Sequence, residues 1–185
     1  LDIHDLSRFN RKEDVGLNKY KQGIAFLATT RGIPQIYYGT ELLMTGTKGE
    51  GDGNIRKDVP GGWPGDEVNA FTPEGRTAIQ NEAYNYMAKL LNWRKTSKAV
   101  THGKLIQYAP VSNHGDCYVY ARIADDETVL VVLNGSDKDA NISMSRYSDV
   151  IGEKFNATDV ITGKEYNLSD KLEVPARGTY VFELK

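Results

Sequence analysis

The sequence predicts a short α/β segment followed by an all-β domain, and three observations carry this prediction. Two stretches, residues 17–30 and the run that ends at Arg94, repeat apolar residues at helical spacing. Between them, residues 33–38 form a short apolar run bounded by glycines, which is typical of a buried parallel strand. After residue 97, short runs of β-branched and aromatic residues alternate with turn residues, and no helical pattern separates them.

The two helices have recognisable ends. The first is expected over residues 17–30 and stops before Gly32. The second is expected to begin at Thr72 and Pro73, a good N-cap and first-turn pair, and to end on Arg94 and Lys95, whose charges suit the negative end of the helix dipole. Residues 39–71 are predicted to be a long loop, and loops of this length are usually functional.

The second half of the chain is expected to be an antiparallel β-sandwich of roughly 85 residues. Turn residues punctuate it at Asn113-His114-Gly115, Asn134-Gly135 and Thr162-Gly163. The expected strands are residues 104–108, 117–123, 128–134, 140–143, 157–161, 171–174 and 179–184.

The first half is not expected to be a domain by itself. One strand, two helices and a loop cannot close a parallel sheet, because each parallel strand must be paired and covered. The order of elements fits the last βα units of a (β/α)8 TIM barrel, here incomplete. We therefore predict that residues 1–97 are the C-terminal end of a catalytic barrel and that residues 98–185 are a C-terminal β-sandwich domain. The true N-terminus is expected upstream of Leu1, and a homo-oligomer is one way to cover the apolar faces that this truncation would expose.

Composition excludes several classes of partner. The formal net charge is −2, so neither nucleic acid nor an anionic membrane is expected to bind. No apolar run approaches the roughly 20 residues that a membrane helix needs. The single Cys117 excludes an intramolecular disulfide and a cysteine-based zinc site. Localisation stays open between periplasm and cytoplasm.

The opening segment carries the main chemical signal. His4 and Asp5 are adjacent at the end of an expected strand, where barrel enzymes place catalytic groups. Without further context, a capping aspartate beside a surface histidine is the simpler interpretation of such a pair.

Further motifs supply the context. His4, Asp5, Arg8 and Phe9 resemble the fourth conserved motif of the α-amylase family of glycoside hydrolases, written Asn-His-Asp with a nearby Arg, although Ile3 stands in the place of the Asn. Three further stretches are similar to the family's last barrel strand, to a loop of neopullulanase- and cyclomaltodextrinase-like members of bacterial type, and to the final strand of the family's C-terminal sandwich. They are residues 32–41, 53–63 and 174–184.

The resemblance implies an enzyme that cleaves α-glucosidic bonds in starch, pullulan, maltodextrin or cyclodextrin with retention of configuration. Such a reaction needs a carboxylate nucleophile and a carboxylic acid about 5–5.5 Å apart. The family takes both from earlier barrel strands, so this chain alone is expected to be inactive. Asp5 would stabilise the transition state, and His4 would hydrogen-bond the same sugar. No cofactor is expected, although Glu50, Asp52 and Asp58 raise the possibility of calcium without fitting an EF-hand loop.

Three other residues are candidates for substrate binding. Trp63 could stack on a glucose ring or anchor its loop against the barrel. Arg56 and Asp58 could bind sugar hydroxyls or pair with each other to pin the loop.

Two other functions compete with the glycosidase. One is a non-catalytic carbohydrate-binding or interaction module, which an exposed row of aromatic residues such as Tyr118, Tyr120 and Tyr180 would favour. The other is a metal-dependent phosphohydrolase, which fits poorly because the remaining histidines, His102 and His114, lie in the predicted β region.

Overall fold

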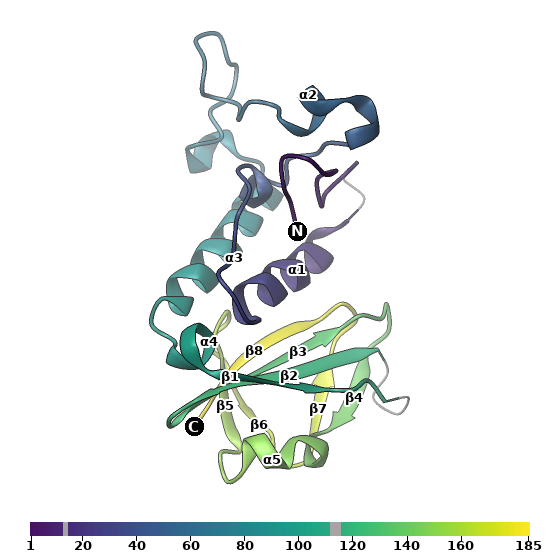
Figure 1. Ribbon diagram of the computed structural model, residues 1–185, viewed down its shortest axis with the longest axis vertical. Helices are drawn as coiled ribbons and strands as arrows, with labels where there is room; N and C mark the ends of the chain where they lie inside the picture. Colours follow the sequence, from purple (N-terminus) through teal and green to yellow (C-terminus); the bar gives the residue numbers. More distant parts are fainter. Residues whose placement is uncertain (13–14, 112–115) are drawn as a thin grey trace. The chain divides into compact units, whose positions relative to one another are not determined.

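The computed structural model describes residues 1–12, 15–111 and 116–185. The chain divides into two compact units, one of residues 1–23 and 34–88, the other of residues 24–33 and 89–185 (Figure 1). Each unit is considered separately below. The predicted turn at Asn113-His114-Gly115 lies outside the described residues.

The larger unit contains two antiparallel sheets. The first has six strands in the order β1-β2-β3-β8-β5-β6, and the second pairs β4 with β7. The antiparallel domain predicted after residue 97 is therefore confirmed. The strands are β1 (Lys104–Tyr108), β2 (Cys117–Ala124), β3 (Glu127–Asn134), β4 (Ala140–Ser143), β5 (Asn156–Asp159), β6 (Glu165–Asn167), β7 (Lys171–Val174) and β8 (Thr179–Leu184).

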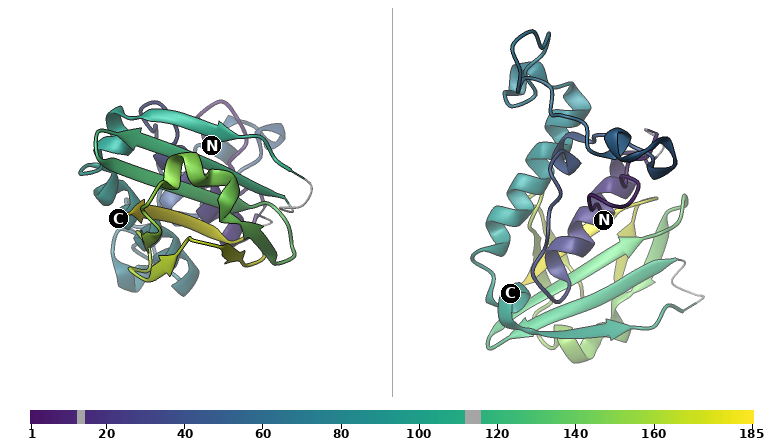
Figure 2. Two further views of the ribbon diagram at one scale, coloured as in Figure 1. Left: turned by 90° about the horizontal axis from the view of Figure 1, so that it is seen from below. Right: turned by 45° about the horizontal axis from the view of Figure 1, so that its top comes forward.

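A single core joins the two sheets. Leu130 and Phe182 of the large sheet share this core with Ile142 and Leu172 of the small one, and all four side chains are buried. A short helical segment, η5 (Met144–Tyr147) and α5 (Ser148–Ile151), adds further apolar side chains to the same cluster. Figure 2 (left) shows α5 lying across the strands on this side of the sheet.

The opposite face of the large sheet is also covered. The end of α1 (Leu17–Thr29), the end of α3 (Ala78–Arg94) and α4 (Lys98–His102) contribute to this unit. Phe26 of α1 packs edge-on against Tyr120 of β2, with ring centroids 6.3 Å apart. Because both faces are covered, residues 128–134 of β3 are all buried, and their apolar run is continuous instead of alternating.

The tyrosines named above do not form an exposed row. Tyr120 is completely buried and hydrogen-bonds Thr29. Tyr118 packs beside Phe26 and Tyr120, and Tyr180 stacks on Phe182 in the core.

The prediction of a buried strand over residues 33–38, of which 34–38 belong to the smaller unit, is wrong. These residues belong to neither sheet, and Ile33 is 95% exposed. A parallel strand forms only when neighbouring strands complete its backbone hydrogen bonds, and the described part of the chain offers it none. The apolar pattern is compatible with a strand, but residues 33–38 do not form one in this structure.

The long loop and the start of the second helix also differ from the prediction. Residues 39–71 contain three short helical turns, which are η1 (Thr40–Leu42), η2 (Lys48–Glu50) and α2 (Asp52–Ile55). Thr72 precedes only a 3₁₀ turn, η3 (Pro73–Gly75), without a side-chain cap.

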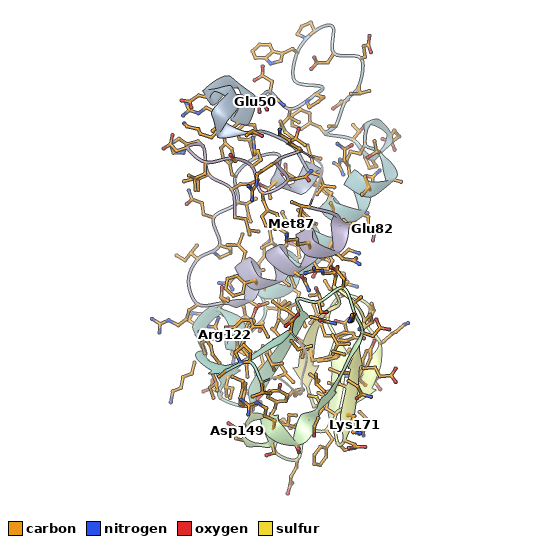
Figure 3. The ribbon with its side chains drawn as sticks, turned by 90° about the vertical axis from the view of Figure 1, so that its right-hand side faces the viewer. Glu50, Glu82, Met87, Arg122, Asp149 and Lys171 are labelled. Atoms are coloured by element: carbon orange, nitrogen blue, oxygen red, sulfur yellow. The ribbon has the colours of Figure 1, made fainter. Side chains whose placement is uncertain are left out.

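The main helix α3 begins at Ala78 behind a reciprocal cap. The Gln80 amide N–H donates to Thr77 Oγ1, and the Thr77 amide N–H donates to Gln80 Oε1. Beyond this cap the helix is amphipathic, with Met87 buried and Glu82 exposed (Figure 3). Among the helices of the described residues, none has the length and apolar character needed to span a membrane.

Candidate functional site

His4 and Asp5 lie together on an exposed loop of the smaller unit. The side chains are 66% and 57% exposed, and His4 Nε2 is 3.0 Å from Asp5 Oδ2. The backbone N–H of Leu6 donates to the carbonyl of Ile3 at 3.3 Å, so the pair sits on a tight turn. Both groups can therefore reach a ligand in solvent without a change in the loop.

Arg56, the residue that follows α2, contacts both of these residues. Its Nη2 is 3.1 Å from Asp5 Oδ1, and its Nε donates to the His4 carbonyl at 3.0 Å. Nη2 also lies 2.9 Å from Asp52 Oδ2, and Lys48 bonds the other oxygen of that carboxylate. The hydrogen bond from Lys48, with the nearby Arg56 charge, lowers the pKa of Asp52. The expected site residues His4, Asp5 and Arg56 thus form one cluster of direct contacts.

Asp58 and Trp63 are not in that cluster of contacts. Asp58 is exposed, and no ion pair joins it to Arg56 in the described part of the chain. Trp63 is 65% exposed. Its loop is closed instead by Asp66, whose Oδ2 accepts the backbone N–H groups of Gly61 at 2.7 Å and Trp63 at 3.1 Å. These bonds, that from Trp63 first, lower the pKa of Asp66.

Two buried charged residues hold the ends of the His4–Asp5 loop. Asp2 accepts hydrogen bonds from the Phe9 backbone N–H and from Thr40 Oγ1. Arg8 donates from Nε to the Ile55 carbonyl at 3.0 Å and from Nη1 to the Tyr38 carbonyl. Sequence reasoning did not single out Asp2 at all, and it used Arg8 only as part of a motif. The signal available in the sequence was the pair of charged residues that flanks the five-residue segment 3–7.

Tyr37 and Tyr38 stack on Arg8. The Arg8 guanidinium carbon lies 4.1 Å from the Tyr37 ring centroid and 4.9 Å from that of Tyr38. Tyr38 remains 40% exposed, and its hydroxyl donates to the Lys57 carbonyl at 3.0 Å. The prediction of a buried strand over residues 33–38 is therefore wrong at these two positions as well.

A polar hollow of about 380 Å³ opens beside α2. Asn54 of α2 lines it together with Arg11, Thr47 and Lys57, and every lining residue is polar. The Asn54 Oδ1 atom is fixed by the Thr47 backbone N–H at 2.7 Å. Such a lining can hydrogen-bond hydroxyl-rich ligands. The described residues contain no group of three or more His, Cys, Asp or Glu side chains arranged to hold a metal ion.

Comparison with known proteins identifies the second half of the chain. Residues 105–183 match the family described as the cyclo-malto-dextrinase C-terminal domain. An α-amylase of Niallia circulans is 29% identical over 171 residues, which cover 88% of this chain and 28% of that protein. A cyclomaltodextrin glucanotransferase of Geobacillus stearothermophilus is 34% identical over 148 residues, which cover 80% of this chain and 17% of that protein. The chain thus spans less than a third of the length of these relatives.

Solved structures agree on the fold. The α-amylase of Geobacillus thermoleovorans, complexed with acarbose, superposes on the whole chain with a TM-score of 0.77 at 19% identity, over 38% of its own length. The γ-cyclomaltodextrin glucanotransferase of alkalophilic Bacillus clarkii gives a TM-score of 0.70 at 25% identity, over 98% of this chain and 25% of its own. Residues 105–183 therefore match a cyclomaltodextrinase-type C-terminal domain, and most of the chain is similar to α-amylases and cyclomaltodextrin glucanotransferases.

Proposed function

We propose that this chain is the C-terminal part of a retaining enzyme that acts on α-glucosidic bonds in starch, pullulan, maltodextrin or cyclodextrin. Residues 1–97 would complete a catalytic barrel, and residues 98–185 would form the domain that follows it. The observation that carries the proposal is the exposed His4–Asp5 pair in direct contact with Arg56. The similarity to the relatives named above supports it, since they are an α-amylase and a cyclomaltodextrin glucanotransferase.

In this proposal Asp5 stabilises the transition state. A carboxylate acceptor that is already oriented gains most from sugar hydroxyls as charge develops on the ring, because it needs no reorganisation at that moment. His4 and Arg56 keep the Asp5 oxygens oriented. Arg56 retains N–H groups, and His4 retains a second ring nitrogen, that can hydrogen-bond the same sugar. Asp58 and Trp63 are proposed as further contacts to the glucan, Trp63 through its exposed indole face.

The nucleophile and the general acid would come from polypeptide outside these 185 residues. We therefore propose that the chain alone does not hydrolyse starch, pullulan or cyclodextrin. The carboxylate pair required for retention, about 5–5.5 Å apart, would lie opposite Asp5 in the complete barrel. Measurable turnover with retained anomeric configuration by the purified chain would contradict this.

The decisive experiment is Asp5→Asn in the full-length enzyme. We expect turnover of maltodextrin to fall by roughly three orders of magnitude, since one preorganised electrostatic contact is worth about 10²–10³ in rate. The matched control is Asp126→Asn, which changes an exposed aspartate of the β-domain and should leave turnover unchanged. An Asp5→Asn enzyme with near-normal turnover would mean that the motif has been misassigned.

The competing proposal of a non-catalytic carbohydrate-binding module is less well supported. It requires aromatic rings in solvent on one sheet face, whereas Tyr120 is buried and the half-buried Tyr180 stacks on Phe182 of the core. The exposed indole in the chain is that of Trp63, which lies outside the β-domain.

A further inference from the structure

The loop that carries His4 and Asp5 runs between two buried charged residues. Asp2 is 4% exposed and Arg8 is 1% exposed, whereas residues 3–6 between them are all exposed. The loop therefore has buried ends and a solvent-facing middle. Hydrophobicity does not explain this pattern of burial, because the two buried end residues, Asp2 and Arg8, are charged.

Asp2 and Arg8 bind different segments of the chain. Asp2 Oδ1 accepts the Phe9 N–H at 2.5 Å, and Asp2 Oδ2 accepts Thr40 Oγ1 at 2.7 Å. These bonds close the base of the loop and attach it to η1.

Arg8 extends the attachment further. Its Nε and Nη1 donate to the carbonyls of Ile55 and Tyr38, and its own N–H donates to the Gly46 carbonyl at 2.9 Å. Ile55 is the last residue of α2, and Arg56, the next residue, contacts Asp5. The Arg8 guanidinium thus links the loop that carries Asp5 to the helix that delivers its partner Arg56.

Stability alone is a poor explanation for this arrangement. Burial of a charge costs several kcal/mol unless bonds replace its hydration, and well-packed apolar residues often serve stability equally well. Arg8 Nη1 is 3.9 Å from Asp2 Oδ2, which is a loose ion pair, and Arg8 Nη2 has no hydrogen-bond partner among the described residues. A role in fixing one conformation of the loop explains a buried polar group such as the Arg8 guanidinium better than a role in stability does.

We propose that Arg8 and Asp2 are positioning residues that hold His4 and Asp5 in their binding geometry. This inference rests on the proposed function for its consequence in catalysis, but its geometric part stands alone. Lysine cannot replace Arg8, because only the planar fork of a guanidinium can reach two carbonyls in fixed directions while stacking on Tyr37.

The geometric part can be tested on the 185-residue chain by NMR. The chain contains three histidines, so the His4 ring signals can be assigned by substitution. Asp5→Asn should shift these signals, because Asp5 Oδ2 contacts His4 Nε2. If Arg8 holds the pair together, the same substitution in an Arg8→Lys background should produce less than about half of that shift. Arg11→Lys, a nearby exposed arginine, is the matched control and should leave the shift at full size.

Folding is checked in the same spectra through the signals of the β-domain. A folded Arg8→Lys chain that retains the full shift would overturn the proposal. If Arg8→Lys does not fold, Asp2→Asn decides in its place, because the amide retains one oxygen acceptor but loses the charge. A full shift in Asp2→Asn would then overturn the proposal, and a reduced shift would support it.

The catalytic part is tested in the full-length enzyme. Arg8→Lys should lower kcat by about 10- to 100-fold, the range expected for a displacement of about 1 Å, while KM changes by less than about 3-fold. A merely structural role would lower the amount of active enzyme at elevated temperature and leave kcat per folded molecule unchanged. Normal turnover in Asp5→Asn would remove the proposed function, whereas the NMR result would still decide whether Arg8 positions the pair.

Discussion

Arg94 and Arg122 donate to adjacent carbonyls at the C-terminus of the same helix. Arg94 Nη1 lies 2.6 Å from the Ala28 carbonyl, and Arg122 Nη1 lies 2.8 Å from that of Thr29. The two cations come from α3 and β2 and supply hydrogen bonds that the last turn of α1 cannot make internally. They also face the negative end of the helix dipole. Burial lowers the pKa of both groups, but an arginine remains charged at any pH at which the protein is folded.

Replacement of Arg122 should therefore destabilise the larger unit. Arg122→Met removes the bond to Thr29 and a second bond, at 2.9 Å, to the Gly103 carbonyl. Both carbonyls would lose a charged donor inside the protein, for which we expect a loss of about 2–4 kcal/mol in the free energy of unfolding. Urea denaturation measures this value. Arg146→Met is the control, because Arg146 is exposed and its guanidinium donates to the Ala109 carbonyl at the surface; an equal loss in both variants would refute the argument.

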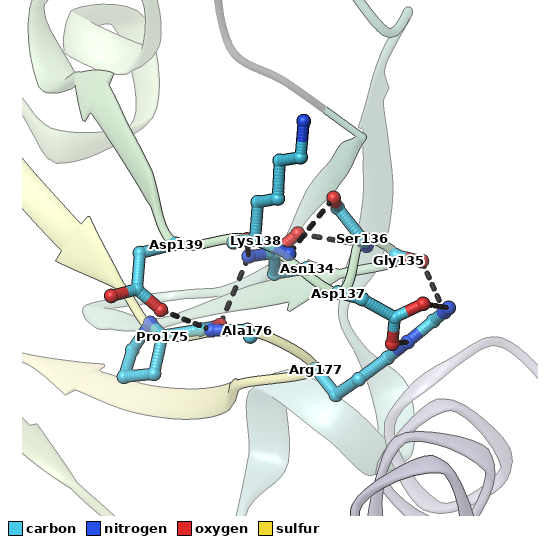
Figure 4. A network of polar contacts seen from close by, with 9 residues as sticks. All are labelled: Asn134, Gly135, Ser136, Asp137, Lys138, Asp139, Pro175, Ala176 and Arg177. Atoms are coloured by element: carbon cyan, nitrogen blue, oxygen red, sulfur yellow. Dashed lines mark hydrogen bonds and ion pairs between the residues drawn. The ribbon is translucent and has the colours of Figure 1, made fainter.

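Asn134, like these arginines, donates to backbone carbonyls, here in two loops of the β-domain. Its buried amide nitrogen donates to the carbonyls of Lys138 and Pro175, and its oxygen accepts the Ser136 N–H at 3.0 Å (Figure 4). The same nitrogen lies 3.2 Å from the Val174 carbonyl. The amide thereby joins the loop after β3 to the turn after β7. Nearby, Arg177 and Asp137 join the same two segments through a bidentate ion pair.

Asn134→Asp should be severely destabilising. A carboxylate has the same shape as the amide, but it would direct an acceptor at carbonyls that need a donor, inside a buried site. We expect a loss of at least about 3 kcal/mol, measured as the change in unfolding free energy at neutral pH. Asn141→Asp, at an exposed position of β4, should cost less than about 1 kcal/mol. Similar losses at the two positions would show that the amide bonds contribute little.

The sequence predicted the β-domain well because its strands find their partners within the chain. The segments predicted at 104–108, 140–143, 171–174 and 179–184 coincide with β1, β4, β7 and β8. β6 was missed, since Glu165–Asn167 offers only Tyr166 as an apolar residue and no alternation can be seen over three positions. The strand predicted at residues 33–38 is absent for the opposite reason. The apolar pattern is present, but the neighbouring strands that would pair with this segment are not among the described residues.

The candidate site was predictable where it depended on adjacent residues. His4 and Asp5 stand next to each other and match a motif, so they could be named from the sequence. The contact between Asp5 and Arg56 spans 51 positions, and only the fold brings them together. The partners of Arg94 were likewise not predictable from neighbouring residues. Its charge was expected to favour the end of its own helix α3, whereas its guanidinium donates to the carbonyls of Ala28 and Gly32, at and beyond the end of α1.

Asp66 should make the loop around Trp63 sensitive to acid. The backbone N–H groups of Trp63 and Gly61 bind its carboxylate and lower its pKa. A lowered pKa means that the stabilisation is present above the ordinary aspartate value of about 3.9 and is lost as the pH falls through the folded-state value. We expect the amide protection of Gly61 and Trp63 against hydrogen exchange to fall in that acidic window.

The Asp66→Asn variant supplies the control for this measurement. An amide oxygen is a weaker acceptor than a carboxylate and does not titrate, so protection should be lower at neutral pH and independent of pH in the acidic range. If the wild-type amides of Gly61 and Trp63 stay equally protected from about pH 6 to about pH 2.5, Asp66 does not hold the loop.

Cys117 should be unreactive in the folded protein. It is 3% exposed in the core beside β3, and burial, with a smaller contribution from Asp116, raises the pKa of its thiol to about 11. Because the thiolate is the reactive form, Ellman's reagent at about pH 8, below the usual thiol pKa of about 8.5, should label the chain only after denaturation. Rapid labelling of the native chain would contradict both the burial and the raised pKa.

The same shift has a consequence for stability at alkaline pH. A raised pKa means that the stabilisation is complete below the ordinary thiol value of about 8.5 and is lost as the pH rises through about 11. The unfolding free energy of the wild type should therefore fall faster with pH in this window than that of Cys117→Ala, by up to about 1.4 kcal/mol per pH unit. Taking the difference between the two variants removes the titration of the tyrosines, which both variants share. Parallel stability curves across this window would show that the thiol titrates alike in the folded and unfolded chains.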